Sequence, residues 1–82
     1  MSEAPIKEFG LVVKALRQQR QLSQEALGFA TTLDRAFISQ LENGHKQPTL
    51  LTIFRLAAAL GVSMAELLGQ VELRLTKGLQ ED

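Results

Sequence analysis

Residues 23–44 read SQEALGFATTLDRAFISQLENG, and this stretch predicts two short helices joined by a tight turn. Ser23 and Asp34 are each expected to cap a helix, because their side-chain oxygens accept hydrogen bonds from otherwise unpaired backbone N–H groups. The expected elements are helices over Gln24–Thr31 and Arg35–Asn43, with a turn at Thr32 and Leu33. The second helix stops at the pair Asn43-Gly44, which is typical of helix ends.

The second of these helices has two chemically different faces. Ile38 and Leu41 are expected to point inward at helical spacing. The outward side chains are Arg35, Ala36, Ser39, Gln40 and Asn43. Arginine pairs with guanine, glutamine pairs with adenine and a methyl group contacts the thymine methyl, so these groups suit the edges of base pairs. The face predicts a helix that reads the major groove.

On both sides of residues 23–44, glycine, proline and capping residues divide the chain into further helices. The expected segments are Pro5–Arg20, Leu50–Leu60 after the cap Thr49 and before Gly61, and a helix begun by the capping box Ser63-Met64-Ala65-Glu66. In the segment 24–31, Leu27 and Ala30 are expected to be buried. The pattern predicts an all-α fold: a compact five-helix DNA-binding domain.

The C-terminal stretch fits two structures. Val71, Leu73 and Leu75 alternate with charged residues, as in a strand, whereas helical spacing connects the residues Leu67, Leu68, Val71, Leu75 and Leu79. We favour a continued helix, because Gly69 is the one helix breaker between the strong start and Leu75. In either case we expect these leucines and the valine to lie beyond the compact core.

Composition excludes several classes of protein. The chain has 82 residues, no cysteine and one histidine, so we expect one domain, no disulfide and no metal site. No apolar run approaches the length of about 20 residues that spans a bilayer. Nine basic residues balance nine acidic ones, although DNA-binding proteins usually carry a basic excess. A local cluster of Arg17, Arg20, Arg35, His45 and Lys46 is expected to supply positive charge near the DNA.

The ordered motifs resemble those of the phage repressor and Cro family of helix-turn-helix regulators. They are SQEAL at 23–27, ISQLENG at 38–44, Pro48-Thr49 and ALGVS at 59–63, and the resemblance covers about residues 6–68. It implies base-reading roles for Arg35, Ala36 and Gln40, joined by Ser39. It implies phosphate contacts for Arg17, Gln24, Asn43, His45 and Lys46, and an ion pair between Arg17 and Glu42.

The run Leu33–Ser39 also resembles the controller proteins of restriction–modification systems, which commonly have threonine and tyrosine where this chain has Ala36 and Phe37. Gly28 and Thr32 stand where the wider family often has alanine and glycine. Glycine inside a helix costs about 1 kcal/mol relative to alanine. A threonine in a left-handed turn is strained. We interpret the two departures as a shifted turn geometry within the same fold.

These observations together predict a cytoplasmic, sequence-specific transcriptional regulator that binds double-stranded DNA as a homodimer. We expect an N-terminal arm at 1–5, a DNA-binding domain at 6–68 and a dimerisation segment at 69–82. The expected dimer contacts are Leu67, Leu68, Val71, Leu75 and Leu79. No catalytic group, cofactor, membrane contact or small-molecule substrate is expected. The alternative is an antitoxin or bridging protein, in which the same helical fold binds mainly another protein.

Overall fold

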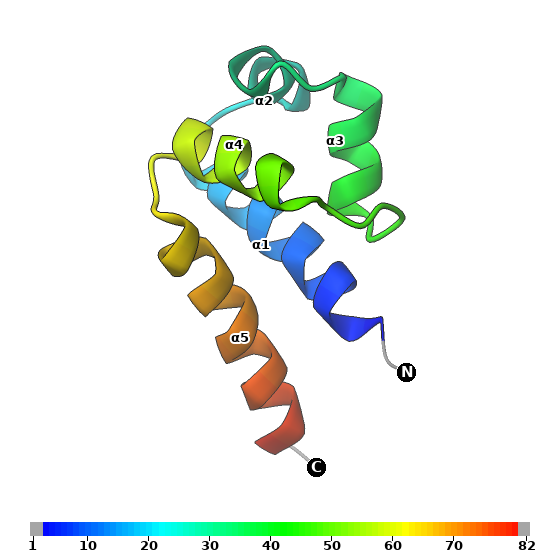
Figure 1. Cartoon of the computed structure of the whole chain (residues 1–82), viewed down its shortest axis with the longest axis vertical. Coiled ribbons are helices and arrows are strands. Elements are labelled where there is room, and N and C mark those ends of the chain that lie inside the picture. Colours follow the sequence, from blue (N-terminus) through cyan, green and yellow to red (C-terminus); the bar gives the residue numbers. More distant parts are fainter. Residues whose placement is uncertain (1–2, 81–82) are drawn as a thin grey trace.

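The computed structural model describes the backbone of residues 3–80 and the side chains of residues 3–77. Within these residues the chain forms α-helices and no strand, so the prediction of an all-α, five-helix fold is confirmed. The helices are α1 at Ala4–Gln19, α2 at Gln24–Thr31, α3 at Arg35–Glu42, α4 at Leu50–Leu60 and α5 at Met64–Gln80 (Figure 1).

The predicted capping residues begin the helices that follow α1. In each case a side-chain oxygen accepts a hydrogen bond from a backbone N–H two or three residues later. The Ala26 N–H donates to the Ser23 hydroxyl at 2.9 Å, and the Ala36 N–H donates to the Asp34 carboxylate at 3.1 Å. The Thr52 N–H donates to the Thr49 hydroxyl at 3.1 Å, and the Glu66 N–H donates to the Ser63 hydroxyl at 2.9 Å. These bonds satisfy donors that a helix start leaves unpaired, which explains why local sequence placed these starts correctly.

The helix α1 is the central element of the fold. It packs against α5 along one side and against α3 on another, while α2 packs on α3 and α4 (Figure 1). The buried core contains Phe9, Val12, Val13, Leu16, Leu27, Ile38, Leu41, Leu56, Ala57, Leu60, Leu67 and Val71. Because every helix contributes to this core, the position of α3 depends on all the others.

The C-terminal stretch forms a helix, and the strand alternative is wrong. The expectation that its apolar residues lie beyond the core is also wrong for Leu67 and Val71, which are buried against the other helices. The reason is the broad apolar surface of α1, which α5 covers on the side opposite α3. Leu75 is partly buried against the same core, so much of α5 stabilises the single chain.

Two expected details at the start of the chain and in α2 differ from the structure. The helix α1 begins at Ala4, inside the expected arm at 1–5, and residues 1 and 2 lie outside the described residues. In α2, Ala30 is exposed and Thr31 is buried instead. The Thr31 hydroxyl donates a hydrogen bond to the Leu27 carbonyl at 2.7 Å, which satisfies the polar group inside the core.

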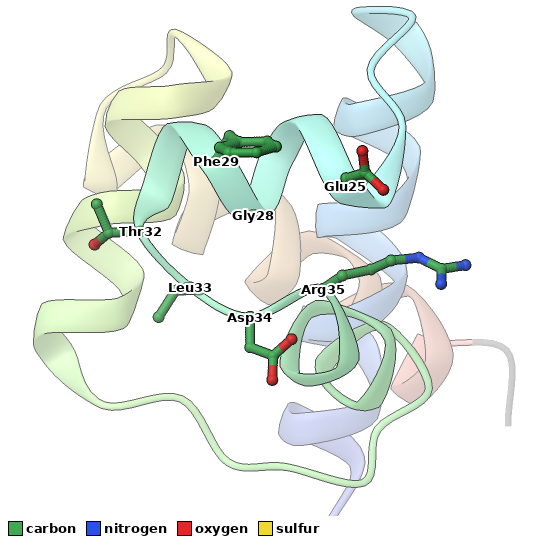
Figure 2. Close-up of a pocket in the computed structure, with 7 residues that line it drawn as sticks. All are labelled: Glu25, Gly28, Phe29, Thr32, Leu33, Asp34 and Arg35. Atoms are coloured by element: carbon green, nitrogen blue, oxygen red, sulfur yellow. The ribbon is translucent and has the colours of Figure 1, made fainter.

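The turn between α2 and α3 accommodates both unusual residues. Thr32 adopts the left-handed conformation with φ 59°, and the Leu33 N–H donates to the Gly28 carbonyl at 3.0 Å. A Cβ atom on residue 28 would lie 2.8 Å from the Leu33 carbonyl oxygen. Gly28 therefore lets the turn fold closely over α2, as Figure 2 shows.

Candidate nucleic-acid interface

The outward face of α3 presents the predicted base-reading groups to solvent. Arg35, Ala36, Gln40 and the following Asn43 are exposed, and Ser39 is partly buried. The recess on this face is lined by Gln24, Asp34, Arg35, Ala36, Ser39 and Gln40. On the opposite side of α3, Ile38 and Leu41 are fully buried and Phe37 packs against the core. One helix thus joins a hydrophobic anchor to a polar, solvent-facing surface.

Arg35 occupies the first turn of α3, beside the turn from α2. Figure 2 shows its side chain extending away from that turn, while Asp34 begins the helix and binds the Ala36 N–H at 3.1 Å. Within the described side chains, no carboxylate or carbonyl accepts a hydrogen bond from Arg35. Its guanidinium therefore presents its donors to solvent in the fork geometry that matches two acceptors of a guanine.

An ion pair fixes the other end of α3 to α1. Arg17 donates from Nε to Glu42 Oε2 at 2.6 Å and from Nη2 to Glu42 Oε1 at 3.0 Å. The two side chains are only 11 % and 2 % exposed. The hydrogen bond to Glu42 raises the pKa of Arg17 above its ordinary value, and burial opposes this rise only in part. The arginine is therefore charged at neutral pH.

Glu42 contacts both Arg17 and Gln24, and these three side chains form a cluster. The family resemblance implies that Arg17 and Gln24 contact DNA phosphates. Gln24 donates from Nε2 to Glu42 Oε1 at 3.1 Å, and Arg17 donates from Nη1 to the Leu22 carbonyl at 2.8 Å. Glu42 thus connects α1, α2 and α3 through one buried carboxylate. The Gln24 amide has a second N–H that this bond does not use, and its phosphate role, like that of Arg17, stays a prediction.

Gly10 sets the distance between α1 and α3. A Cβ atom at this position would lie 2.2 Å from the Leu41 carbonyl oxygen and 2.8 Å from that of Glu42, and both oxygens belong to the backbone. The sequence analysis did not single out this residue. A glycine within an amphipathic helix often has a packing reason, so the sequence contains a signal that could have identified Gly10.

The loop after α3 carries the remaining predicted phosphate contacts. Asn43, His45 and Lys46 are exposed, and the His45 N–H donates to the Gln40 carbonyl at 2.8 Å. The expectation that Arg20 lies near this surface is wrong. Its guanidinium lies over Gly61, where a Cβ atom would meet Nη1 at 2.6 Å, between α4 and α5.

The described residues do not meet the requirements of a metal site or of a single membrane-spanning helix. In the described part of the chain, no group of three or more histidine or acidic side chains is placed to hold a metal ion. No single helix there is long and apolar enough to cross a membrane, although α4 and residues Met64–Lys77 pass that test as a pair bent by 102°.

Comparison with known proteins gives consistent similarities. Residues 13–67 match the helix-turn-helix family. The chain is 35 % identical over 65 residues to the control protein C.MunI from Mycoplasma sp., covering 78 % of this chain and 88 % of that protein. It is 31 % identical over 61 residues to the immunity repressor protein of Bacillus phage phi105, covering 74 % of this chain and 42 % of the repressor.

A solved structure shows the same arrangement of helices. The restriction-modification controller protein C.AhdI from Aeromonas hydrophila superposes with a TM-score of 0.74 at 37 % sequence identity, covering 76 % of this chain and 94 % of that protein. Both resemblances drawn from the sequence, to phage repressors and to controller proteins, are thus confirmed by independent comparison.

Proposed function

Because this chain belongs to the helix-turn-helix family of DNA-binding transcriptional regulators, we propose that it binds a short DNA operator as a homodimer. Each copy inserts α3 into the major groove, while the N-terminus of α2 and the loop after α3 lie along the phosphate backbone. The observation that carries this proposal is the exposed polar face of α3 on a helix whose other side is buried.

Base reading is assigned to Arg35, Ala36, Ser39 and Gln40. Arg35 offers a bidentate contact to guanine, Gln40 offers one to adenine, and the Ala36 methyl suits thymine. Backbone phosphates are assigned to Asn43, His45 and Lys46, with Gln24 and Arg17 contributing from the cluster around Glu42. We expect the protein to act in the cytoplasm, without a cofactor or catalytic group.

Substituting Arg35 tests this assignment directly. We expect Arg35→Ala to weaken binding to the operator by about 1–3 kcal/mol and to relax the sequence preference at one base pair. The operator is first obtained by in vitro selection from random DNA with the full chain. Binding is then measured by fluorescence anisotropy on the selected sequence and on variants that differ at single positions.

Arg35→Lys separates base reading from charge. Lysine keeps the positive charge but lacks the planar fork, so a base contact is expected to weaken with little change in binding to random DNA. If Arg35→Ala weakens binding equally on every sequence and Arg35→Lys restores the affinity, Arg35 contacts a phosphate instead. Unchanged binding by Arg35→Ala removes it from the interface altogether.

We place the dimer surface mainly on α4. The helix α5, which carries the five dimer contacts predicted from the sequence, contributes less. Leu67 is fully buried and Val71 is only 6 % exposed, so neither offers much area to a partner, and the side chain of Leu79 lies outside the described residues. On α5, Leu68 and Leu73 are exposed. The helix α4 has three exposed large apolar side chains, Leu50, Leu51 and Phe54, and is therefore the larger apolar surface.

The size of the molecule suits two copies on neighbouring half-sites. It measures 39 × 22 × 22 Å, and operator half-sites one helical turn apart are separated by about 34 Å. The longest dimension of one copy is therefore similar to the spacing of two half-sites. Burying the exposed α4 side chains also adds apolar area that an 82-residue chain lacks in its own core.

Charging the α4 surface is expected to separate the copies. Phe54→Glu should shift the chain from dimer to the 9.0 kDa monomer in analytical ultracentrifugation, because dimerisation would bury an unpaired carboxylate. Phe29→Glu, at a phenylalanine that is also exposed but lies on α2, is the matched control and should remain dimeric. A monomeric wild-type chain, or a dimeric Phe54→Glu variant with an unchanged melting temperature, contradicts this dimer surface.

A second candidate function is an antitoxin or bridging protein that binds mainly another protein. The exposed phenyl ring of Phe29, which stands on the outer side of α2 in Figure 2, favours it. The two functions differ in binding to DNA. A folded dimer that does not bind random or selected DNA at about 50 mM salt, where phosphate contacts are strong, excludes the operator-binding proposal.

A further inference from the structure

We propose that Lys7, near the start of α1, binds a backbone phosphate of DNA beside the loop that follows α3. This inference rests on the proposed operator binding and adds a contact that neither the sequence motifs nor the comparisons assign. The ligand is the phosphodiester of double-stranded DNA, recognised by a single ammonium group independently of base sequence.

The position of Lys7 follows from its contact with Gly44. A Cβ atom on Gly44 would lie 3.3 Å from Lys7 Cα, 3.6 Å from its Cβ and 3.8 Å from its Cγ. Gly44 lies between Asn43 and His45, which belong to the proposed phosphate-binding loop. The stem of Lys7 therefore begins within that loop's immediate surroundings, although 36 residues separate Lys7 from Asn43 in the sequence.

The packing of α1 against α3 fixes the position of Lys7 relative to α3. Gly10, one helical turn after Lys7, brings the α1 backbone against the carbonyl groups of Leu41 and Glu42. Arg17, further along α1, is bound to Glu42 at 2.6 Å. Lys7, Gly10 and Arg17 follow one another at helical spacing, so the side of α1 that carries Lys7 borders the C-terminal end of α3.

Within the described part of the chain, Lys7 has no acidic partner, whereas several other cations already contact groups within the protein. Arg17 is paired with Glu42, Arg74 is paired with Glu8, and Arg20 lies over Gly61. Lys7 is exposed, and among the side chains of residues 3–77 no carboxylate forms an ion pair with it. In a chain with zero net charge, an unpaired lysine beside Gly44 is expected to contribute strongly to phosphate binding.

The test compares the salt dependence of DNA binding by the full chain, Lys7→Gln and Lys77→Gln. Each phosphate contact contributes about 0.9 to the slope of log affinity against log salt. We expect Lys7→Gln to reduce the slope by about 1.8, because each copy of the dimer loses one contact, so its affinity falls about twelvefold less than that of the wild type between 50 and 200 mM salt. Both the operator and random DNA should show the same reduction.

Lys77→Gln is the matched control, because Lys77 is exposed on α5, which packs on α1 and α4 and not on α3. Lys7→Arg should restore the wild-type slope. An unchanged slope for Lys7→Gln, or an equal reduction for Lys77→Gln, overturns the Lys7 contact while leaving operator binding in place. If the wild-type dimer binds no DNA, operator binding and the Lys7 contact are both overturned.

Discussion

Replacing Gly10 with alanine is expected to lower the free energy of unfolding by about 2–3 kcal/mol, as overpacked sites do. The new methyl group would meet two backbone oxygens, those of Leu41 and Glu42, at 2.2 Å and 2.8 Å. Neither oxygen belongs to a flexible side chain, so α1 and α3 must move apart. The measurement is urea denaturation followed by circular dichroism.

Gly69→Ala is the matched control for this substitution. Gly69 also lies inside a helix, but no atom lies within 4 Å of a Cβ built there. Alanine is the better helix former, so this variant should be more stable than the wild type by about 0.5–1 kcal/mol. The two substitutions are chemically identical and are expected to differ in sign. A neutral or stabilising effect of Gly10→Ala would show that α1 and α3 do not meet as closely as described.

Removing the Glu42 carboxylate is expected to destabilise the chain by about 3 kcal/mol, as broken buried ion pairs do. Glu42→Ala leaves the Arg17 guanidinium, which is 11 % exposed, and the Gln24 amide without their shared acceptor. The three helices that meet at this carboxylate should then become less rigidly connected. Thermal and urea unfolding both measure the loss.

The matched control uses the other ion pair of the described residues. Glu8→Ala removes the partner of Arg74, whose side chain is 48 % exposed, and should cost no more than about 1 kcal/mol because water replaces the lost contact. The double variant Arg17→Met/Glu42→Leu should recover much of the stability, since it leaves no buried charge unpaired. Equal costs for Glu42→Ala and Glu8→Ala would contradict the structural role of this buried pair.

The sequence predicted the secondary structure of this chain well because its signals are local. The caps Ser23, Asp34, Thr49 and Ser63 each act within one helical turn, and the helix starts follow them closely. The two faces of α3 were also evident, because residues three and four apart share a side of a helix. The candidate base-reading face required no knowledge of the tertiary structure.

Errors arose where a residue's environment depends on distant elements. Leu67 and Val71 have the same apolar character as the exposed Leu68, and their spacing on α5 does not show that α1 covers them. Arg20 follows Arg17 by one helical turn, yet it lies over Gly61 while Arg17 pairs with Glu42. Burial and charge pairing come from the packing of helices, which the local pattern of residues does not contain.

Local chemistry along the chain was therefore sufficient for the helix boundaries, the turn between α2 and α3, and the polar face of α3. These features arise from contacts within a few residues, which the order of amino acids specifies directly. The proximity of Lys7 to Gly44, the fit of Gly10 against α3 and the burial of α5 emerged when the helices packed. Each of them joins residues far apart in the chain, and the shared hydrophobic core brings those residues together.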